Sequence, residues 1–133
     1  MRLLTRNQSR RLDQVSMEKL GIPGLRLMEN AGKKVAEVSK SILEGKKRER
    51  QIAICCGKGN NGGDGFSAAL HLDHFNVTIF SLPAISDILG DSLHFYNKCV
   101  EKGMKIVHGC ELPTSNEFDL IIDGLIGTGF SGE

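Results

Sequence analysis

The 133-residue sequence predicts an α/β fold built on a mostly parallel sheet. Short apolar runs alternate along the chain with longer helix-like segments, which is the order of elements that gives parallel strands with right-handed crossovers. In addition, glycine-rich loops follow two of the apolar runs. Loops after the carboxyl ends of strands are where open parallel sheets bind ligands.

Two helices are expected before the first strand. Thr5 and Gln8 have the T-x-x-Q spacing of a capping box, which predicts a helix from about Arg6 to Leu20, ended by "GIPG" at 21–24. A second helix is predicted from apolar residues at steps of three and four, which form a single stripe: Met28, Ala31, Val35, Val38 and Ile42.

Strands and helices then alternate. The first strand, "QIAICC" at 51–56, is almost continuously apolar, as expected for a strand covered on both faces. The other expected strands are "NVTIF" (76–80), "MKIVH" (104–108) and "DLIID" (119–123), and the expected helices are "FSAALHL" (66–72) and "DSLHFYNKCVEKG" (91–103). The length suits a single domain over residues 1–133.

Composition argues against several partners. The formal net charge is +1, and the basic run at 45–50 is short enough for a solvated loop, so no nucleic-acid partner is expected. No apolar stretch approaches the roughly 20 residues of a membrane span, and the N-terminus lacks the apolar region of a signal peptide. The four cysteines include no C-x-x-C pair, which favours a reducing, cytoplasmic setting over a disulfide or zinc site.

The segment "GKGNNGGDG" at 57–65 holds five glycines in nine positions. It fits G-x-G-x-x-G, but no acidic residue ends the next strand before Asp87, as a dinucleotide site requires, and Gly63 and Asp64 stand where a P-loop needs Lys and Ser or Thr. Glycines at a strand-to-helix turn still admit a ligand close to the backbone. The alternative is a turn that needs glycine, with Asp64 capping the helix.

A second signal is "DGLIGTGFSGE" at 123–133, where Asp123 ends the last strand. In a parallel sheet, both glycine loops and both aspartates would line the same edge. Asn61 and Asp123 carry oxygen ligands that suit a hard cation. The alternative is that Asp123 only terminates its strand.

Three segments together resemble the NAD(P)H-hydrate epimerase family, that is, the YjeF N-terminal-type domain: "GIPGLRLMENAG" (21–32), "GKGNNGGDGFSAALHL" (57–72) and "DGLIGTGFSG" (123–132). The resemblance implies a Rossmann-like three-layer sandwich with the N-terminal helices packed on the sheet, and a possible homodimer. It also implies an isomerase of metabolite repair, which interconverts the R and S forms of hydrated NADH and NADPH (NADHX and NADPHX) so that an NAD(P)H-hydrate dehydratase can restore the cofactor.

The same resemblance implies a site. Asn61 and Asp123 would bind a potassium ion as cofactor. The residues expected to contact the hydrated dinucleotide are Asn60, Asn61, Gly62, Gly63, Asp64, Gly127, Thr128, Gly129, Phe130, Ser131, Gly132 and Glu133.

The family's later strand and its "DIPSG"-like segment, which carry the presumed catalytic aspartate, have no counterpart before Glu133. We therefore expect this sequence to be a piece of a longer protein, and no catalytic acid or base is assigned within it. Two other functions stay open. One is a non-catalytic binding or scaffold domain of the same fold. The other is a small-molecule kinase, which the missing phosphate-binding lysine disfavours.

Overall fold

A parallel sheet of four strands forms one layer of the computed structural model, which describes residues 24–44, 50–109, 111–114 and 117–124. The strands are β1 (Gln51–Cys56), β2 (Asn76–Ser81), β3 (Lys105–His108) and β4 (Leu120–Gly124), in the order β3-β2-β1-β4. From β1 the chain forms β2 and then β3 on one side of β1, and it then crosses to form β4 on the other side of β1. The carboxyl ends of β1 and β4 therefore form the point at which such sheets bind ligands.

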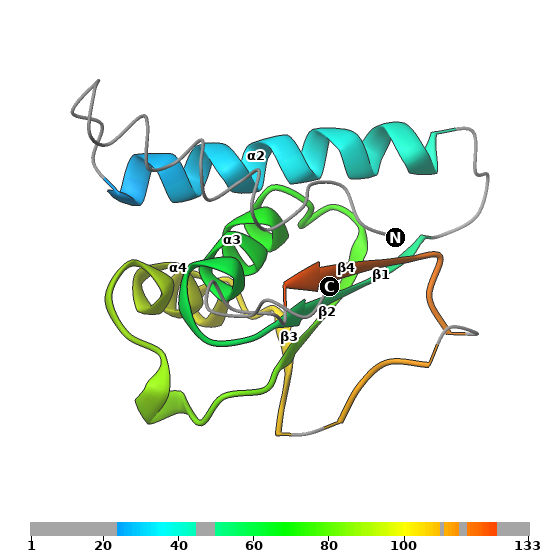
Figure 1. Ribbon diagram of the computed structural model, residues 1–133. Coiled ribbons are helices and arrows are strands. Elements are labelled where there is room, and N and C mark those ends of the chain that lie inside the picture. The colour runs from blue at the N-terminus through cyan, green and yellow to red at the C-terminus, as the bar shows by residue number, and fades with distance from the viewer. Residues whose placement is uncertain (1–23, 45–49, 110, 115–116, 125–133) are drawn as a thin grey trace, which may run out of the picture.

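The helices form two further layers. α3 (Gly59–Leu70) and α4 (Gly90–Glu101) cover one face of the sheet, and α2 (Gly24–Leu43) packs across α3 on the side away from the sheet (Figure 1). A single 3₁₀ turn, η2 (Ile85–Asp87), lies between β2 and α4. The predicted α/β architecture with a parallel sheet is confirmed, and α2 reaches the sheet mainly through α3. The predicted helix at 6–20 lies outside the described residues.

The predicted stripe of α2 is confirmed in part. Met28 is buried, and Val35 and Ile42 pack half-buried against the main core, but the most buried positions after Met28 lie one residue later than predicted. They are Gly32, Ala36, Ser39 and Leu43, where the prediction had Ala31, Val35, Val38 and Ile42. A Cβ atom at Gly32 would lie 2.1 Å from the Ser67 Oγ atom, so α2 and α3 approach at a position where only hydrogen fits. A pattern of apolar residues does not register glycine or serine as buried, which is why Gly32 and Ser39 were not predicted. Ala36 and Leu43 each follow an apolar residue that fits the same spacing, so the pattern alone did not distinguish them from Val35 and Ile42.

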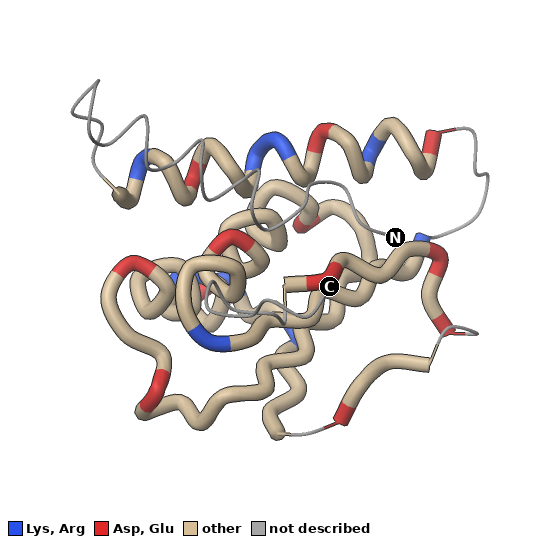
Figure 2. The backbone as a smooth tube through the Cα atoms, in the orientation of Figure 1, with Lys and Arg blue, Asp and Glu red and all other residues tan. Residues whose placement is uncertain are grey.

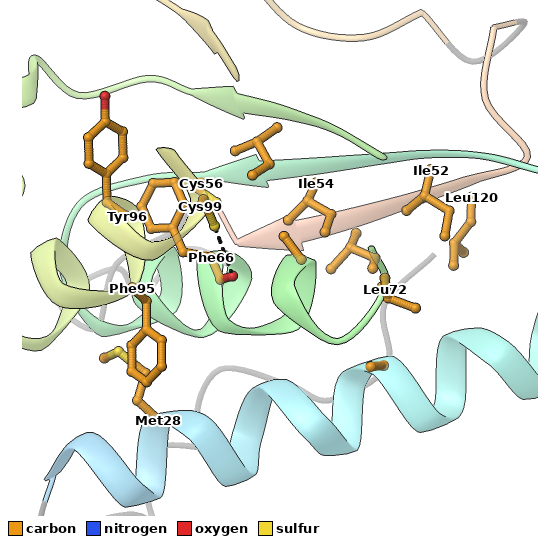
Figure 3. Close-up of a cluster of buried hydrophobic side chains, with 14 of the residues drawn as sticks. Met28, Ile52, Ile54, Cys56, Phe66, Leu72, Phe95, Tyr96, Cys99 and Leu120 are labelled. Carbon is orange, nitrogen blue, oxygen red and sulfur yellow. Dashed lines mark hydrogen bonds between the residues drawn. The ribbon is translucent and has the colours of Figure 1, made fainter. Parts of the chain in front are cut away.

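The main core lies between the sheet and the helices. It includes Ile52 and Ile54 of β1, Phe66 of α3 and Tyr96 of α4 (Figure 3). The Phe66 and Tyr96 rings meet edge to face, with centroids 5.4 Å apart. This geometry is favourable for aromatic pairs. The contacts of Phe66 within this core hold α3 against β1, and they thereby determine the position of the first glycine loop between these two elements.

A smaller apolar cluster lies on the other face of the sheet. Ala53, Cys55 and Phe80 are buried there, and Phe118 packs edge to face on Phe80 at 5.9 Å. Basic and acidic residues both occur along α2 (Figure 2), and all of them are exposed. None of the helices in the described ranges is both long and apolar enough to cross a membrane.

Candidate functional site at the carboxyl edge of the sheet

The first glycine loop and the end of β4 are in direct contact. The Gly57 N–H donates a hydrogen bond of 2.8 Å to the Gly124 carbonyl oxygen. A Cβ atom on Gly124 would lie 2.8 Å from the Cys55 carbonyl oxygen and 2.9 Å from that of Asn61. The prediction that both loops share one edge is confirmed as far as Gly124. Residues 125–133, which include the predicted contacts from Gly127 to Glu133, lie outside the described part of the chain.

α3 begins within the glycine loop, well before the expected start at Phe66. Its N-cap is Lys58, which has extended backbone angles and makes no side-chain cap hydrogen bond. The predicted ligand contacts from Asn60 to Asp64 therefore lie in the first turns of the helix. Asp64 is six positions after the cap, so the alternative in which Asp64 caps the helix is wrong.

Two glycines of the loop have a packing reason to be glycine. A Cβ atom at Gly62 would lie only 2.0 Å from the Gly57 carbonyl oxygen, and one at Gly63 would lie 2.4 Å from Met28 Sδ and 2.5 Å from Ser92 Oγ. Both glycines are buried. The loop thus folds back on its own backbone, with α2 and α4 in contact with it.

The other two glycines at the start of α3, Gly59 and Gly65, differ in their surroundings. A Cβ atom at Gly65 would lie 2.7 Å from Cys56 Sγ, whereas Gly59 has a positive φ of 76° with open space around it. Ser92 Oγ donates a 2.7 Å hydrogen bond to the Gly59 carbonyl oxygen. Ser92 was not predicted as a positioning residue. Its only signal was a hydroxyl in the first turn of a helix that starts near this edge.

The two aspartates both lie close to the cysteines that end β1. Asp123 is exposed and pairs in register with Cys55, whose pKa is raised to about 11 by burial and further by the Asp123 charge. The pKa of Cys56 is raised well above its usual value by burial first, and then by Cys99, Cys55 and Asp64. These thiols are therefore neutral structural groups.

We expect Cys55, Cys56 and Cys99 to resist labelling in the folded chain. All three are free and buried, and the pKa of Cys99 is raised by burial to about 12. At pH 8 the thiolate fractions of Cys55 and Cys99 are then on the order of 10⁻³ and 10⁻⁴. In a Cys110→Ser background, thiol release with a disulfide reagent should be slow in buffer and immediate in denaturant. Reaction in buffer at the rate of a free thiol would contradict this assignment.

The donor atoms at this edge fit a hard cation better than a transition metal. The two residues predicted as ligands both bring oxygen atoms to this edge: Asp123 is exposed near the end of β4, and the Asn61 main-chain carbonyl lies beside Gly124, the next residue of that strand. Within the described ranges, no three His, Cys, Asp or Glu side chains gather as a metal-binding group. Carboxylate and carbonyl oxygens are the ligands that hard cations prefer.

Comparison with known proteins gives a consistent result. The family model "YjeF-related protein N-terminus" matches residues 24–133. An NAD(P)H-hydrate epimerase of Rhodopirellula baltica is 37% identical over 95% of this chain and 52% of its own length, and one of Pirellula staleyi is 36% identical over 99% and 60%. A bifunctional NAD(P)H-hydrate repair enzyme of Moorella thermoacetica is 37% identical over 99% of this chain and 27% of its own.

A solved structure has the same fold. The crystal structure of the yeast protein ynu0 (YNL200c) superposes with a TM-score of 0.76 at 22% identity, covering all of this chain and 60% of the yeast chain. The chain thus spans about half to three fifths of the epimerases that it matches. Because the family model matches from the start of α2 to residue 133, the chain belongs to the family of YjeF-related protein N-termini.

Proposed function

We propose that this chain provides the substrate-binding part of an NAD(P)H-hydrate epimerase, which interconverts the R and S forms of NADHX and NADPHX. The observation that carries the proposal is the contact of the first glycine loop with the end of β4, through Gly57, Asn61 and Gly124. This contact brings the described parts of both predicted site segments to the edge at which open parallel sheets commonly bind ligands, which supports the proposal. The names of the epimerase relatives support the choice of reaction.

The first turn of α3 would orient the dinucleotide. Helix N-termini present N–H groups that favour phosphate, and Lys58 makes no side-chain hydrogen bond that would cap them. The Lys58 ammonium is largely exposed and adds a positive charge beside this turn. The Asp64 carboxylate lies one turn further along, where it suits hydroxyl groups better than phosphate oxygens. No residue is assigned as general acid or base.

A potassium ion is part of the proposal. Asn61 and Asp123 would hold it, together with main-chain carbonyls at the same edge. When bound, the ion would offset part of the negative charge of the dinucleotide. Support comes from the all-oxygen donor set and from the position of Asp123 at the exposed end of β4.

We also propose a functional partner and a cellular location for the protein. Relatives that are bifunctional repair enzymes support a functional link to a dehydratase. The three free cysteines of the described part are compatible with the cytoplasm. The homodimer stays a prediction.

The Asp123→Asn substitution should remove the potassium-dependent part of substrate binding. We expect NADPHX to raise the melting temperature of the unaltered chain more in potassium than in sodium, because a ligand that binds only the folded state stabilises it. Asp123→Asn should retain the fold, since the side chain is exposed, but lose the difference between the salts. Glu37→Gln, which removes an exposed carboxylate of α2, is the matched control. An equal shift in both salts for the unaltered chain would contradict the cation site.

A scaffold domain is the second candidate function. It is favoured by the packing contacts of Gly62, Gly63 and Gly65, which would require glycine even without a ligand. Following the R-to-S ratio of NADPHX by chromatography separates the two candidates. Epimerisation above the spontaneous rate supports the enzyme, and binding without turnover supports the scaffold.

A further inference from the structure

A second hollow lies at the opposite edge of the sheet. Its volume is about 540 Å³, and it is formed at the amino ends of β1, β2 and β3 and by the connections that lead into β2 and β3. The volume is within the range of roughly 300–1,000 Å³ that is usual for small-molecule sites. Asn61 and Asp123 stand at the carboxyl edge, so this hollow is separate from the proposed epimerase site.

Four polar side chains of the hollow come from neighbouring positions on the sheet. Gln51 of β1 pairs in register with Asn76 of β2, and Thr78 of β2 pairs with Lys105 of β3. Residues two apart on a strand share a face, so Asn76 and Thr78 point to the same side. That side is opposite to the face that packs Ile79 against the helices. The four side chains therefore form one polar group.

The hydrogen-bonding capacity of this group is not used within the described chain. No hydrogen bond of the Gln51, Asn76 or Thr78 side chain is formed with another described residue, although Thr78 is only 9% exposed. The Thr78 hydroxyl is not among the buried polar atoms that lack a partner in the described residues, so it keeps access to solvent and is open to a ligand in the hollow.

The hollow also has an uncompensated positive charge. Lys102 pairs with Asp73 at its rim, and this hydrogen bond is the first cause of the lowered pKa of Asp73. Lys105, in contrast, has no ion-pair partner among the residues that the structure describes. The lining charges therefore leave one ammonium available to an anion.

Val77 and Met104 also line the hollow, but they pack against the main core on the helix side of the sheet, so they do not belong to the polar group. We propose that the hollow binds a small organic anion, with its carboxylate or phosphate on Lys105 and its hydroxyl or amide groups on Gln51, Asn76 and Thr78. This inference does not depend on the proposed epimerase activity.

The test is a titration followed by amide NMR signals of the ¹⁵N-labelled chain. Benzoate and AMP serve as carboxylate and phosphate probes, with benzyl alcohol and adenosine as their neutral counterparts. We expect saturable shifts at Gln51, Asn76, Thr78 and Lys105 for at least one anion and much weaker ones for its neutral counterpart. The Lys105→Ala substitution should weaken binding about tenfold, the usual effect of losing a charged hydrogen-bond donor.

A matched variant controls for general charge. Lys98→Ala removes an exposed lysine of α4 that does not line the hollow, and it should leave the affinity unchanged. The proposal is overturned if neither anion gives saturable shifts up to about 10 mM, tenfold above the usual ~1 mM upper range for enzyme ligands. It is also overturned if Lys105→Ala binds as tightly as the unaltered chain, or if the shifts are confined to residues 58–64 at the other edge.

Discussion

The Gly62→Ala substitution is expected to destabilise the chain by about 2 kcal/mol or more, although alanine is the better helix former. In an unconstrained helix the change would gain about 0.5–1 kcal/mol. Here the new Cβ atom would lie 2.0 Å from the Gly57 carbonyl oxygen, which is backbone and cannot rotate away. Overpacking of this kind typically costs about 1–3 kcal/mol, and a shift of Gly57 would also strain its hydrogen bond to Gly124. Urea unfolding monitored by circular dichroism measures the difference.

Gly59→Ala is the control for this substitution. Gly59 has open space around it and a φ of 76°, so alanine there should cost only about 1–2 kcal/mol through backbone conformation, with no steric contact. If Gly62→Ala proves as stable as the unaltered chain, the close packing of the loop on itself is wrong. If it is destabilised as expected, loss of ligand binding in that variant says nothing about a direct contact between Gly62 and the ligand.

The Phe66→Ala substitution should have the largest effect on stability, about 3–5 kcal/mol. Phe66 is fully buried, packs edge to face on Tyr96, and accepts a hydrogen bond from Cys99 Sγ at its carbonyl oxygen (Figure 3). Since small domains are stable by only about 5–15 kcal/mol, this loss should remove a large fraction of the free energy of unfolding. The melting temperature and the urea midpoint are the measurements.

Two control substitutions test whether the effect comes from the loss of the buried Phe66 ring. Phe66→Leu keeps most of the volume and should cost less than about 1.5 kcal/mol, the usual limit for well-tolerated apolar exchanges. Leu89→Ala removes a side chain that is 70% exposed and should change the stability by about 0.5 kcal/mol at most. If Phe66→Ala unfolds at the same urea concentration as Leu89→Ala, Phe66 does not hold α3 on the sheet.

The strands were predictable because their signal is local. Runs such as 51–56 and 119–123 are apolar, short and bounded by glycine or polar residues, and the observed strands agree with them to within one residue. The parallel order followed from the helices between them. The placement of Asn61 and Asp123 at one edge then needed only the rule that the carboxyl ends of parallel strands coincide.

The features that escaped prediction depend on contacts between distant segments. Gly32 is buried because Ser67 lies opposite it, and the early start of α3 runs against the low helix propensity of Gly62 and Gly63. The hollow around Thr78 and Lys105 could not be predicted from the sequence either. Neither residue belongs to a recognisable motif, and only the pairing of β2 with β3 brings their side chains together. Such features depend on tertiary contacts that no local pattern contains.

The pairing of β4 with β1 has a consequence for the order of folding. The hydrogen bond between the Gln51 N–H and the Asp119 carboxylate joins residues 68 apart, whereas β1, α3, β2, α4 and β3 follow one another along the chain. Closing such a long loop is slow relative to local contacts, and during synthesis β4 leaves the ribosome after β1, β2 and β3. Among the four described strands, β4 is therefore the last to be added, and an ion held at the edge formed by Gly57, Asn61 and Gly124 would stabilise only chains in which β4 is already paired with β1.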